Sequence, residues 1–380
     1  MALVAAIGSK HCFYLTMNQA KQFKRGLVVG KFCPLHKGHE LLINRALQAC
    51  ERVTVISYTK PGFEHCGRAA RETWLKSLFP GIEMLVIDDE SLRNTCQQRG
   101  LLFQEIPDND AGDEIHRQFV GWLCWEVLSH TVDAVFTSEN YGDGFAKTLS
   151  HYFSARTGSS NQVTHVCVDK SRTAIPISGS AIRQNPTYYR DFLSPIVYAS
   201  FIRRVCFLGG ESSGKTTLAA AMASRFATKW VPEYGRELWL QKQGKLETTD
   251  MVSIAREQVA REVAQSQQAT QWLFCDTSPL TTLFYSLALF GNADQELRKL
   301  ANREYDHVFL CAPDFPFVQD GTRQNSEFRE HQHAWYLDEL RKRSIRFELI
   351  SGSFSDRIEA ASRLLPSRQE MQVTCHTSED

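Results

Sequence analysis

The sequence lacks the features that mark membrane proteins, secreted proteins and strongly charged nucleic-acid binders. No segment reaches the run of about 18 apolar residues that a membrane-spanning helix needs. The apolar start, MALVAAIG, is too short to span a membrane and lacks the basic residues and cleavage pattern of a signal peptide. The 43 basic and 43 acidic side chains cancel, which argues against a strongly basic nucleic-acid binder or a polybasic membrane anchor.

The cysteines also lack a pattern. The chain has 11 of them, all scattered singly and none in a C-x-x-C pair. A disulfide framework or a zinc ribbon needs cysteines in pairs or clusters. We therefore expect reduced thiols and a cytoplasmic protein.

The length and the periodicity predict two domains of the α/β class. A chain of 380 residues is too long for one typical domain. The strand-like GLVVGKF (26–32) precedes the amphipathic GHELLINRALQAC (38–50), and the alternation restarts at IRRVCFLGG (202–210). Such alternation is typical of doubly wound parallel sheets, which bind ligands at the carboxyl ends of their strands.

The same patterns predict where the other strands, the helices and the domains begin and end. Further strands are predicted at 52–58, 83–88, 130–138, 163–169, 272–276, 306–311 and 346–350, with a short one at Trp230-Val231, and further helices at 68–79, 214–226, 250–270, 279–290 and 328–343. The predicted organisation is an N-terminal arm (1–24), a first domain (25–200), a second domain (201–365) and a flexible tail (366–380).

The second half carries a phosphate-binding loop. Residues 209–216, GGESSGKT, fit the pattern G-x-x-x-x-G-K-[ST] in full, after an apolar strand and before a helix. Glycines let the backbone N–H groups face phosphate oxygens, and the helix start adds its positive end. Lys215 can reach the β- and γ-phosphates of ATP, and the Thr216 hydroxyl can bind Mg²⁺. The predicted ATP-binding residues are Gly209, Gly210, Ser212, Ser213, Gly214, Lys215, Thr216 and Thr217.

Three further segments offer groups for phosphoryl transfer. Asp276 ends the apolar run QWLFCD, where it can face Mg²⁺ or merely cap the next helix. Glu233, in VPEYGRE, can hold or deprotonate a substrate hydroxyl, or lie in a surface loop. The polar segment QDGTRQNSEFRE can form a cationic lid with Arg323 and Arg329, or a solvated helix start. The candidate substrate-binding residues here are Glu233, Tyr234, Arg236 and Arg323.

The first half carries a histidine turn. In VVGKFCPLHKGHELL (28–42), His36 and His39 flank Gly38 between a strand and a helix. Amides at the helix start suit an anion, and two imidazoles can stabilise charge on a leaving pyrophosphate. A pair spaced i, i+3 with no nearby Glu or Cys set is poor for zinc, and a single histidine is often only a packed core residue. The turn therefore favours phosphate chemistry.

Two segments of the first half resemble the signatures of the nucleotidyltransferase superfamily. Residues 30–39, GKFCPLHKGH, are similar to G-x-F-x-P-x-H-x-G-H, and residues 177–183, ISGSAIR, to I-S-x-T-x-I-R, with Ser180 where the family commonly has Thr. SENYGDG (138–144) is more weakly similar to a nucleotide-contacting segment. The resemblance implies that Arg183, at a helix start, reaches the ATP phosphates. It implies an ATP site of Gly30, Phe32, His36, Gly38, His39, Ser178, Ser180 and Arg183, and a substrate site with Glu139 and Tyr141.

From residue 25 to about 365, the whole architecture resembles the NadR-type bifunctional nicotinamide-nucleotide adenylyltransferase/ribosylnicotinamide kinases. The family resemblance implies that ribosylnicotinamide attacks the γ-phosphate of ATP, with Lys215, Thr216, Asp276 and Mg²⁺ at the phosphates and Glu233 or Asp276 as base. The nicotinamide mononucleotide (NMN) formed would then attack the α-phosphate of a second ATP beside His36, His39 and Arg183. The products would be NAD and pyrophosphate, with no covalent enzyme intermediate.

The resemblance also implies which partners to expect, and it leaves two alternative functions to consider. The longest family members begin with a helix-turn-helix domain, for which the residues before Lys24 are too few, so we expect no DNA binding. We expect small-molecule partners, a homo-oligomer and a transient contact with a nicotinamide riboside transporter. The rivals are a cytidylyl- or pantetheine-phosphate adenylyltransferase fused to a nucleoside kinase, and a non-catalytic nucleotide sensor. The intact His36, His39, Lys215 and Thr216 argue against a sensor.

Overall fold

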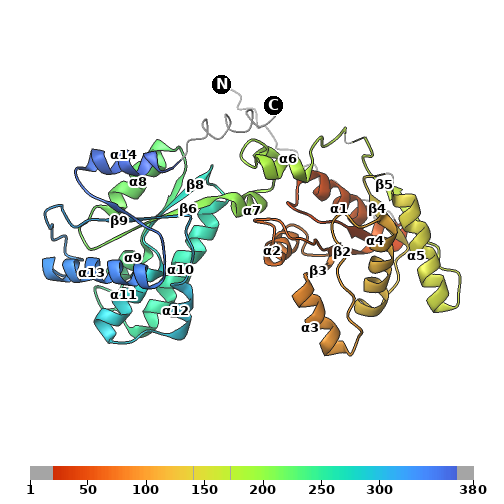
Figure 1. Ribbon diagram of the computed structural model, residues 1–380, viewed down its shortest axis with the longest axis horizontal. Helices are drawn as coiled ribbons and strands as arrows, with labels where there is room; N and C mark the ends of the chain where they lie inside the picture. Colours follow the sequence, from red (N-terminus) through yellow and green to blue (C-terminus); the bar gives the residue numbers. More distant parts are fainter. Residues whose placement is uncertain (1–19, 140, 172, 366–380) are drawn as a thin grey trace, which may run out of the picture. The chain divides into compact units, whose positions relative to one another are not determined.

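The chain forms two compact units. The computed structural model describes residues 20–139, 141–171 and 173–365, and Figure 1 shows their helices and strands. The units divide between Pro176 and Ile177, except that Pro34–His36 groups with the second unit. Each unit contains one five-stranded sheet in which the observed strand pairs are parallel.

The first sheet has the strand order β3-β2-β1-β4-β5. Its strands are β1 (Phe23–Val29), β2 (Cys50–Ser57), β3 (Glu83–Val86), β4 (Ala134–Thr137) and β5 (Thr164–Cys167). The central strand β1 aligns Val28 with Val55 of β2 and with Phe136 of β4. The strand order reverses between β1 and β4, so their carboxyl ends form the edge where such sheets bind ligands.

Helices cover this sheet through apolar faces. They are α1 (Lys37–Ala49), α2 (Arg68–Leu78), α3 (Asp89–Arg99), α4 (Asp113–Trp122), a π-helical turn (Leu123–Val127) and α5 (Gly142–Thr157). One core cluster joins Leu27 and Val135 of the strands to Phe119, Leu149 and Phe153 of the helices. Burial of these side chains is the main stabilising term for the unit.

The second sheet has the strand order β10-β9-β6-β8-β7. Its strands are β6 (Arg203–Gly209), β7 (Lys229–Val231), β8 (Trp272–Asp276), β9 (His307–Cys311) and β10 (Glu348–Ile350). The helices of this unit are α6 (Gly179–Gln184), α7 (Pro195–Tyr198), α8 (Lys215–Arg225), α9 (Tyr234–Gln241), α10 (Thr248–Ser266), α11 (Pro279–Phe290), α12 (Gln295–Leu300), α13 (Ser326–Lys342) and α14 (Phe354–Arg363), with 3₁₀ turns at Arg190–Phe192 and Ala199–Phe201.

Successive side chains of β6 belong to two different core clusters, one on each face of the sheet. Val205 and Phe207 belong to the core cluster that includes Leu218 of α8. Cys206 and Leu208 belong to the cluster on the opposite face, with Met251 of α10. Side chains of a strand point alternately to the two faces, so the buried apolar run 205–208 requires both faces to be covered. The phosphate loop therefore follows directly on the buried part of this strand.

The predicted α/β class and the two parallel sheets are confirmed. Sequence patterns did not predict α3, whose buried residues are only Leu92 and Cys96, nor α4 and α5. Phe23 and Lys24, assigned to the arm, are the first residues of β1. The rest of the arm up to residue 19 and the predicted tail (366–380) lie outside the described residues. The predicted domain limit at 200/201 stays a prediction.

The sequence also predicted the absence of membrane-spanning helices and of disulfide bonds. Within the described ranges, none of the helices combines the length and the apolar character that a membrane crossing needs. The cysteines that the structure describes are free thiols, and most of them are buried.

Candidate active sites

The phosphate loop of the second unit has the curled backbone that its motif predicts. Gly209 and Gly214 adopt φ angles of 146° and 82°, and Ser212 adopts a left-handed φ of 58°. A Cβ on Gly209 would lie 2.7 Å from both the carbonyl oxygen of Cys311 and Oγ of Ser213. Only glycine fits this position, because any larger residue would meet the neighbouring strand.

Lys215 and Thr216 lie at the start of α8, where the motif places them. Nζ of Lys215 donates a hydrogen bond to the carbonyl oxygen of Gly210 at 2.9 Å, so the ammonium group folds back over the loop. Oγ1 of Thr216 donates to Oδ2 of Asp276 at 2.6 Å. The structure thus brings together the predicted lysine, threonine and aspartate.

Asp276 ends β8 with its carboxylate enclosed. The residue is 1% exposed, and Oδ1 has no hydrogen-bond partner among the described residues. Burial raises its pKa, and the opposing effects come from Lys215, Thr216 and Arg236. No group of three or more His, Cys, Asp or Glu that could hold a metal is present in the described part of the chain. A spare carboxylate oxygen beside a threonine hydroxyl fits Mg²⁺, which completes its shell with water and phosphate oxygens.

A pocket lies beside the phosphate loop, with Glu211 of the loop in its lining. Its apolar wall consists of Trp239, Leu246, Met251, Ile254 and Leu289. Its polar lining consists of Glu211, Glu233, Arg236, Gln258, Thr277, Thr281, Thr282, Tyr285, Thr322, Arg323 and Gln324. An apolar wall facing several hydroxyl, amide and charged groups suits a nucleoside, which has a flat base and a hydroxylated sugar.

Glu233 is the carboxylate best placed to act as a base in this pocket. It immediately precedes α9 and lines the pocket. Burial, and secondly the charge of Asp276, raise its pKa from 4.5 to about 6, against the opposing effects of Lys215 and Arg236. A carboxylate with a pKa near the working pH is suited to accept a proton from a hydroxyl group.

Gln258 of α10 presents an unused donor to the same pocket. Its Oε1 accepts the backbone N–H of Tyr234 at 3.0 Å, which fixes the orientation of the amide, since only oxygen can accept. The residue is 2% exposed, and Nε2 has no hydrogen-bond partner among the described residues. An unpaired buried N–H group is costly, so an acceptor atom of a ligand would fit here.

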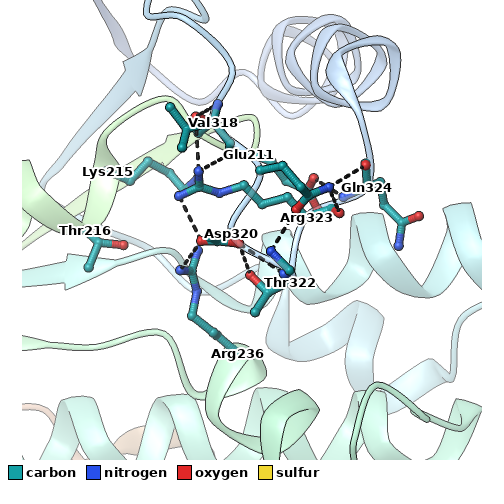
Figure 2. Close-up of polar contacts among 12 residues, drawn as sticks. Glu211, Lys215, Thr216, Arg236, Val318, Asp320, Thr322, Arg323 and Gln324 are labelled. Carbon is teal, nitrogen blue, oxygen red and sulfur yellow. Dashed lines mark hydrogen bonds and ion pairs between the residues drawn. The ribbon is translucent and has the colours of Figure 1, made fainter.

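The segment 318–324 is attached to the phosphate loop at both ends, as Figure 2 shows. The backbone N–H of Val318 donates to Oγ of Ser212 at 3.1 Å, and that of Gln324 donates to Oε2 of Glu211 at 2.7 Å. Nη1 of Arg323 donates to Oγ of Ser212 at 3.3 Å. Arg329 instead lies buried on α13 and donates to the carbonyl oxygen of Phe315 at 2.8 Å. Of the two arginines considered for a lid, Arg323 lines the pocket.

In the first unit, Phe32 orients the histidine turn. Phe32 has a left-handed φ of 49°, and its ring meets that of His39 edge-on, with centroids 5.0 Å apart. A Cβ on Gly30 would lie 2.9 Å from the Phe32 ring. His36 is buried just before α1, which starts at Lys37, and Gly38 and His39 lie in its first turn. The turn therefore places both histidines at the amino end of a helix, as the sequence predicted.

The second signature forms the short helix α6. Oγ of Ser178 accepts the backbone N–H of Ala181 at 3.2 Å and so caps this helix. Arg183 lies in its last turn rather than at its start, because the helix spans only six residues. Nη2 of Arg183 donates to Oγ of Ser180 at 3.1 Å, so the hydroxyl that replaces the common threonine contacts the arginine. The role of these residues at ATP phosphates stays a prediction.

The segment with Glu139 and Tyr141 is held by a short hydrogen-bond chain. Nδ1 of His165 lies 2.7 Å from Oδ1 of Asp143, and its Nε2 lies 2.9 Å from Oγ1 of Thr137, which ends β4. Thr137 also donates to the carbonyl oxygen of Glu139 at 3.1 Å. Burial, then the charge of Glu139, raise the pKa of Tyr141 to about 12, so the phenol stays neutral at physiological pH.

Comparisons with known proteins cover both units. A family model described as an AAA domain matches residues 204–357. The trifunctional NAD biosynthesis/regulator protein NadR of Escherichia coli (strain K12) is 29% identical over 342 residues, 85% of this chain and 77% of that protein. The NadR of Salmonella typhimurium is 27% identical over 340 residues, 86% of this chain and 78% of that protein.

The chain is therefore similar to NadR proteins over most of its length. A crystal structure of NadR protein in complex with NR covers 91% of the chain and 96% of its own, with a TM-score of 0.64 at 18% identity. A second, in complex with NAD and AMP-PNP, has a TM-score of 0.61 at 17% identity and covers 90% of the chain and 96% of its own. At these identities the structures support the NadR-type fold in both units.

Four residues around the pocket and phosphate loop of the second unit were not predicted from the sequence. Glu211 occupies a variable position of the phosphate-loop pattern, and its Oε1 accepts the hydroxyl of Tyr285 at 2.9 Å. Gln258 and Tyr285 lie on helices whose apolar periodicity attracts attention to other residues. Asp320 lies in a polar segment that resembles any solvated turn. The one available signal was Asp320-Gly321-Thr322, a turn-forming triplet.

Proposed function

We propose that this protein makes NAD from ribosylnicotinamide in two ATP-dependent steps, one in each half of the chain. The observation that carries the proposal is the pocket in which Glu233 and Gln258 face a complete phosphate loop with its Thr216–Asp276 pair. A kinase for a small hydroxylated molecule needs such a pocket. The histidine turn and the ISGSAIR signature supply the second, separate phosphate chemistry.

In the kinase step, the 5′-hydroxyl of ribosylnicotinamide attacks the γ-phosphorus of ATP, and Glu233 accepts the hydroxyl proton. Glu233 is preferred to Asp276 as the base because Oδ2 of Asp276 already accepts the Thr216 hydroxyl. Lys215 and Arg323 stabilise the negative charge on the transferred group. Thr216 and Asp276 would hold Mg²⁺, which neutralises phosphate charge when bound. Gln258 donates to an oxygen of the nucleoside. The products are NMN and ADP.

In the adenylyl step, a phosphate oxygen of NMN attacks the α-phosphorus of ATP, and pyrophosphate leaves. His36, His39 and the amides at the start of α1 stabilise the charge on pyrophosphate, and Arg183 contacts the phosphates. Phe32 holds the His39 ring edge-on, so the imidazole needs little reorganisation before it acts. Catalysis here consists of positioning and charge stabilisation.

The relatives support this assignment. The curated relatives are named for NAD biosynthesis, and the solved structures carry NR in one case and NAD with AMP-PNP in the other. Those ligands belong to those proteins, and we propose the same classes here. We also propose cytoplasmic localisation, a homo-oligomer and a transient contact with a nicotinamide riboside transporter; gel filtration with light scattering tests the oligomer.

The test is to measure the two half-reactions separately with the full chain. Ribosylnicotinamide with Mg·ATP should give NMN and ADP, and NMN with Mg·ATP should give NAD and pyrophosphate, each detected by chromatography. Nucleotide binding without turnover in either half-reaction would contradict the proposal and favour a nucleotide sensor.

A second candidate concerns the substrate of the first unit. The phosphopantetheine adenylyltransferase of Fusobacterium nucleatum is 26% identical over 149 residues, 36% of this chain and 88% of that protein. This similarity favours adenylyl transfer, and it makes phosphopantetheine a second candidate for the molecule that accepts the adenylyl group. Competition between NMN and phosphopantetheine for ATP would decide, because formation of dephospho-coenzyme A rather than NAD would replace the proposed substrate.

A further inference from the structure

Asp320 is held in a fixed orientation by its own turn. Its Oδ1 accepts the backbone N–H of Thr322 at 3.0 Å and the Thr322 hydroxyl at 2.7 Å. Gly321 between them has a φ of 84°, which favours glycine. An aspartate bonded to the backbone two residues on forms a rigid local turn. One carboxylate oxygen is therefore used to fix the side chain, and the other is left to face the pocket side.

That second oxygen holds two arginines from different elements, as Figure 2 shows. Oδ2 of Asp320 lies 3.3 Å from Nη1 of Arg236 on α9 and 3.1 Å from Nη2 of Arg323. Burial raises the pKa of Asp320, but bonds from Thr322 and the charges of Arg323 and Arg236 outweigh it and lower the pKa. Two like-charged guanidinium groups repel each other, so a shared carboxylate is what keeps them adjacent.

Both arginines border the space where phosphate chemistry would occur. Arg236 and Arg323 line the same pocket as Glu233, and Arg323 also donates to Ser212 of the phosphate loop. The segment that carries Asp320 is attached to that loop through Val318 and Gln324. The phosphate loop, the turn and the two guanidinium groups thus form one connected hydrogen-bonded unit.

We propose that Asp320 is a positioning residue for phosphoryl transfer, which sets Arg236 and Arg323 side by side in the lining of the pocket. The proposal rests on the proposed kinase function and adds a residue to it. Asp320 itself does not contact the reacting atoms. Partly exposed ion pairs of this kind contribute little to folding stability, whereas small misplacement of a charge-stabilising group lowers catalytic rates strongly. The effect of Asp320 is therefore expected in the rate and not in the stability.

The test compares Asp320→Asn with Thr322→Val and Glu327→Gln in the full chain. Asparagine keeps an oxygen for Thr322 but replaces the charged oxygen with an NH₂ group that faces the guanidinium groups. Thr322→Val keeps the charge and removes the hydroxyl bond. Glu327 is exposed in the first turn of α13, the helix that follows the segment of Asp320. Glu327→Gln removes one negative charge, as Asp320→Asn does, and so serves as the control. ATP turnover is followed with ribosylnicotinamide and with a panel of other nucleosides.

We expect Asp320→Asn to lower kcat of the kinase step by about 10- to 100-fold, with a smaller change in KM for ATP. The kcat of Thr322→Val should lie between those of Asp320→Asn and the wild type, and the kcat of Glu327→Gln should equal that of the wild type. Melting temperatures and the adenylyl step should not change. An unaltered kcat in Asp320→Asn, an equal loss in Glu327→Gln, or a change in KM alone would overturn the proposal.

The wild-type result separates this proposal from the proposed function. Turnover with another nucleoside but not with ribosylnicotinamide would refute the proposed substrate, and the variants would then be compared with the nucleoside that is used. No nucleoside-dependent ATP turnover by the wild type would overturn both.

Discussion

We propose that both units bind a triphosphate, and that they do so with different chemical groups. Each places its first strand inside a parallel sheet and follows it with a turn and a helix. In the second unit the turn leads into Lys215, and Arg323 donates a hydrogen bond to Ser212 of the turn. The turn between β1 and α1 instead carries His36 and His39, and its best-defined contact is the Phe32 ring against His39.

In the proposed reactions, the difference follows from which phosphorus atom reacts. Charge in the proposed kinase step develops on a small γ-phosphoryl group, and Asp320 holds two of the arginines that line the pocket there. Attack at the α-phosphorus releases a large, mobile pyrophosphate. Neutral or singly charged imidazoles and helix amides suit this leaving group, because they stabilise charge without retaining the product.

The largest effect should come from Lys215→Ala. Removing the ammonium group that folds over the loop should lower the kinase rate on the order of 10³-fold, because the γ-phosphate loses its main cationic contact. The adenylyl step should stay at the wild-type rate. Both are measured in the same preparation with NMN or ribosylnicotinamide as substrate. Loss of both activities would break the comparison, because it would mean that the two sites are not independent.

The reverse change is His39→Ala. It should lower the adenylyl rate about 10²- to 10³-fold, since one group that stabilises the pyrophosphate is lost, and leave the kinase step unchanged. Phe32→Leu sharpens the test: it keeps His39 but removes the ring that holds it, and should cause a smaller loss. Equal losses in the two variants would mean that the turn, and not the imidazole, carries the effect.

How far sequence reasoning reached differs between the units. The phosphate loop was found whole because its residues are adjacent in the chain and its geometry is local. Asp276 became a candidate because it ends an apolar run, where a carboxylate can face Mg²⁺, and Glu233 because a carboxylate there can hold or deprotonate a substrate hydroxyl. Glu211, Gln258 and Asp320 were not found, because their roles depend on partners 24 to 113 positions away: Tyr234, Gln324 and Arg236. Arg183 was expected at a helix start and lies at a helix end, because the length of a six-residue helix is not encoded by periodicity.

The close approach of Gly142 to His165 gives a prediction for the first unit. A Cβ on Gly142 would lie 2.0 Å from Nε2 of His165, so Gly142→Ala should cost about 1–3 kcal/mol through overpacking. It should also slow the adenylyl step by moving the segment that carries Tyr141. In a His165→Ala background the space is free, and the stability cost of Gly142→Ala should largely vanish. Hydrogen exchange of the β4 amides measures that cost; equal costs in both backgrounds would mean that His165 does not hold the segment against Gly142.

The smallest expected change in stability tests the charge balance of the second unit through pH. Burial and Asp276 raise the pKa of Glu233 from 4.5 to about 6 in the folded chain. The folded state therefore binds more protons than the unfolded state between these values, and the ionised Glu233 opposes folding above pH 6. Glu233→Gln should stabilise the second unit by up to about 2 kcal/mol above pH 6, with the gain disappearing below pH 4.5.

The measurement is hydrogen exchange of the β6 and β8 amides without nucleotide or Mg²⁺, since either would add charge beside the carboxylate. Glu327→Gln, an exposed residue, is the matched control and should show no such pH dependence. The kinase step should be lost in Glu233→Gln while the adenylyl step continues. The same substitution would therefore stabilise the second unit and remove its activity. No gain in stability would mean that Lys215 and Arg236 balance the charge of Glu233 in the folded state. A gain that persists below pH 4.5 would mean that the effect of Glu233→Gln does not come from the ionisation of the carboxylate.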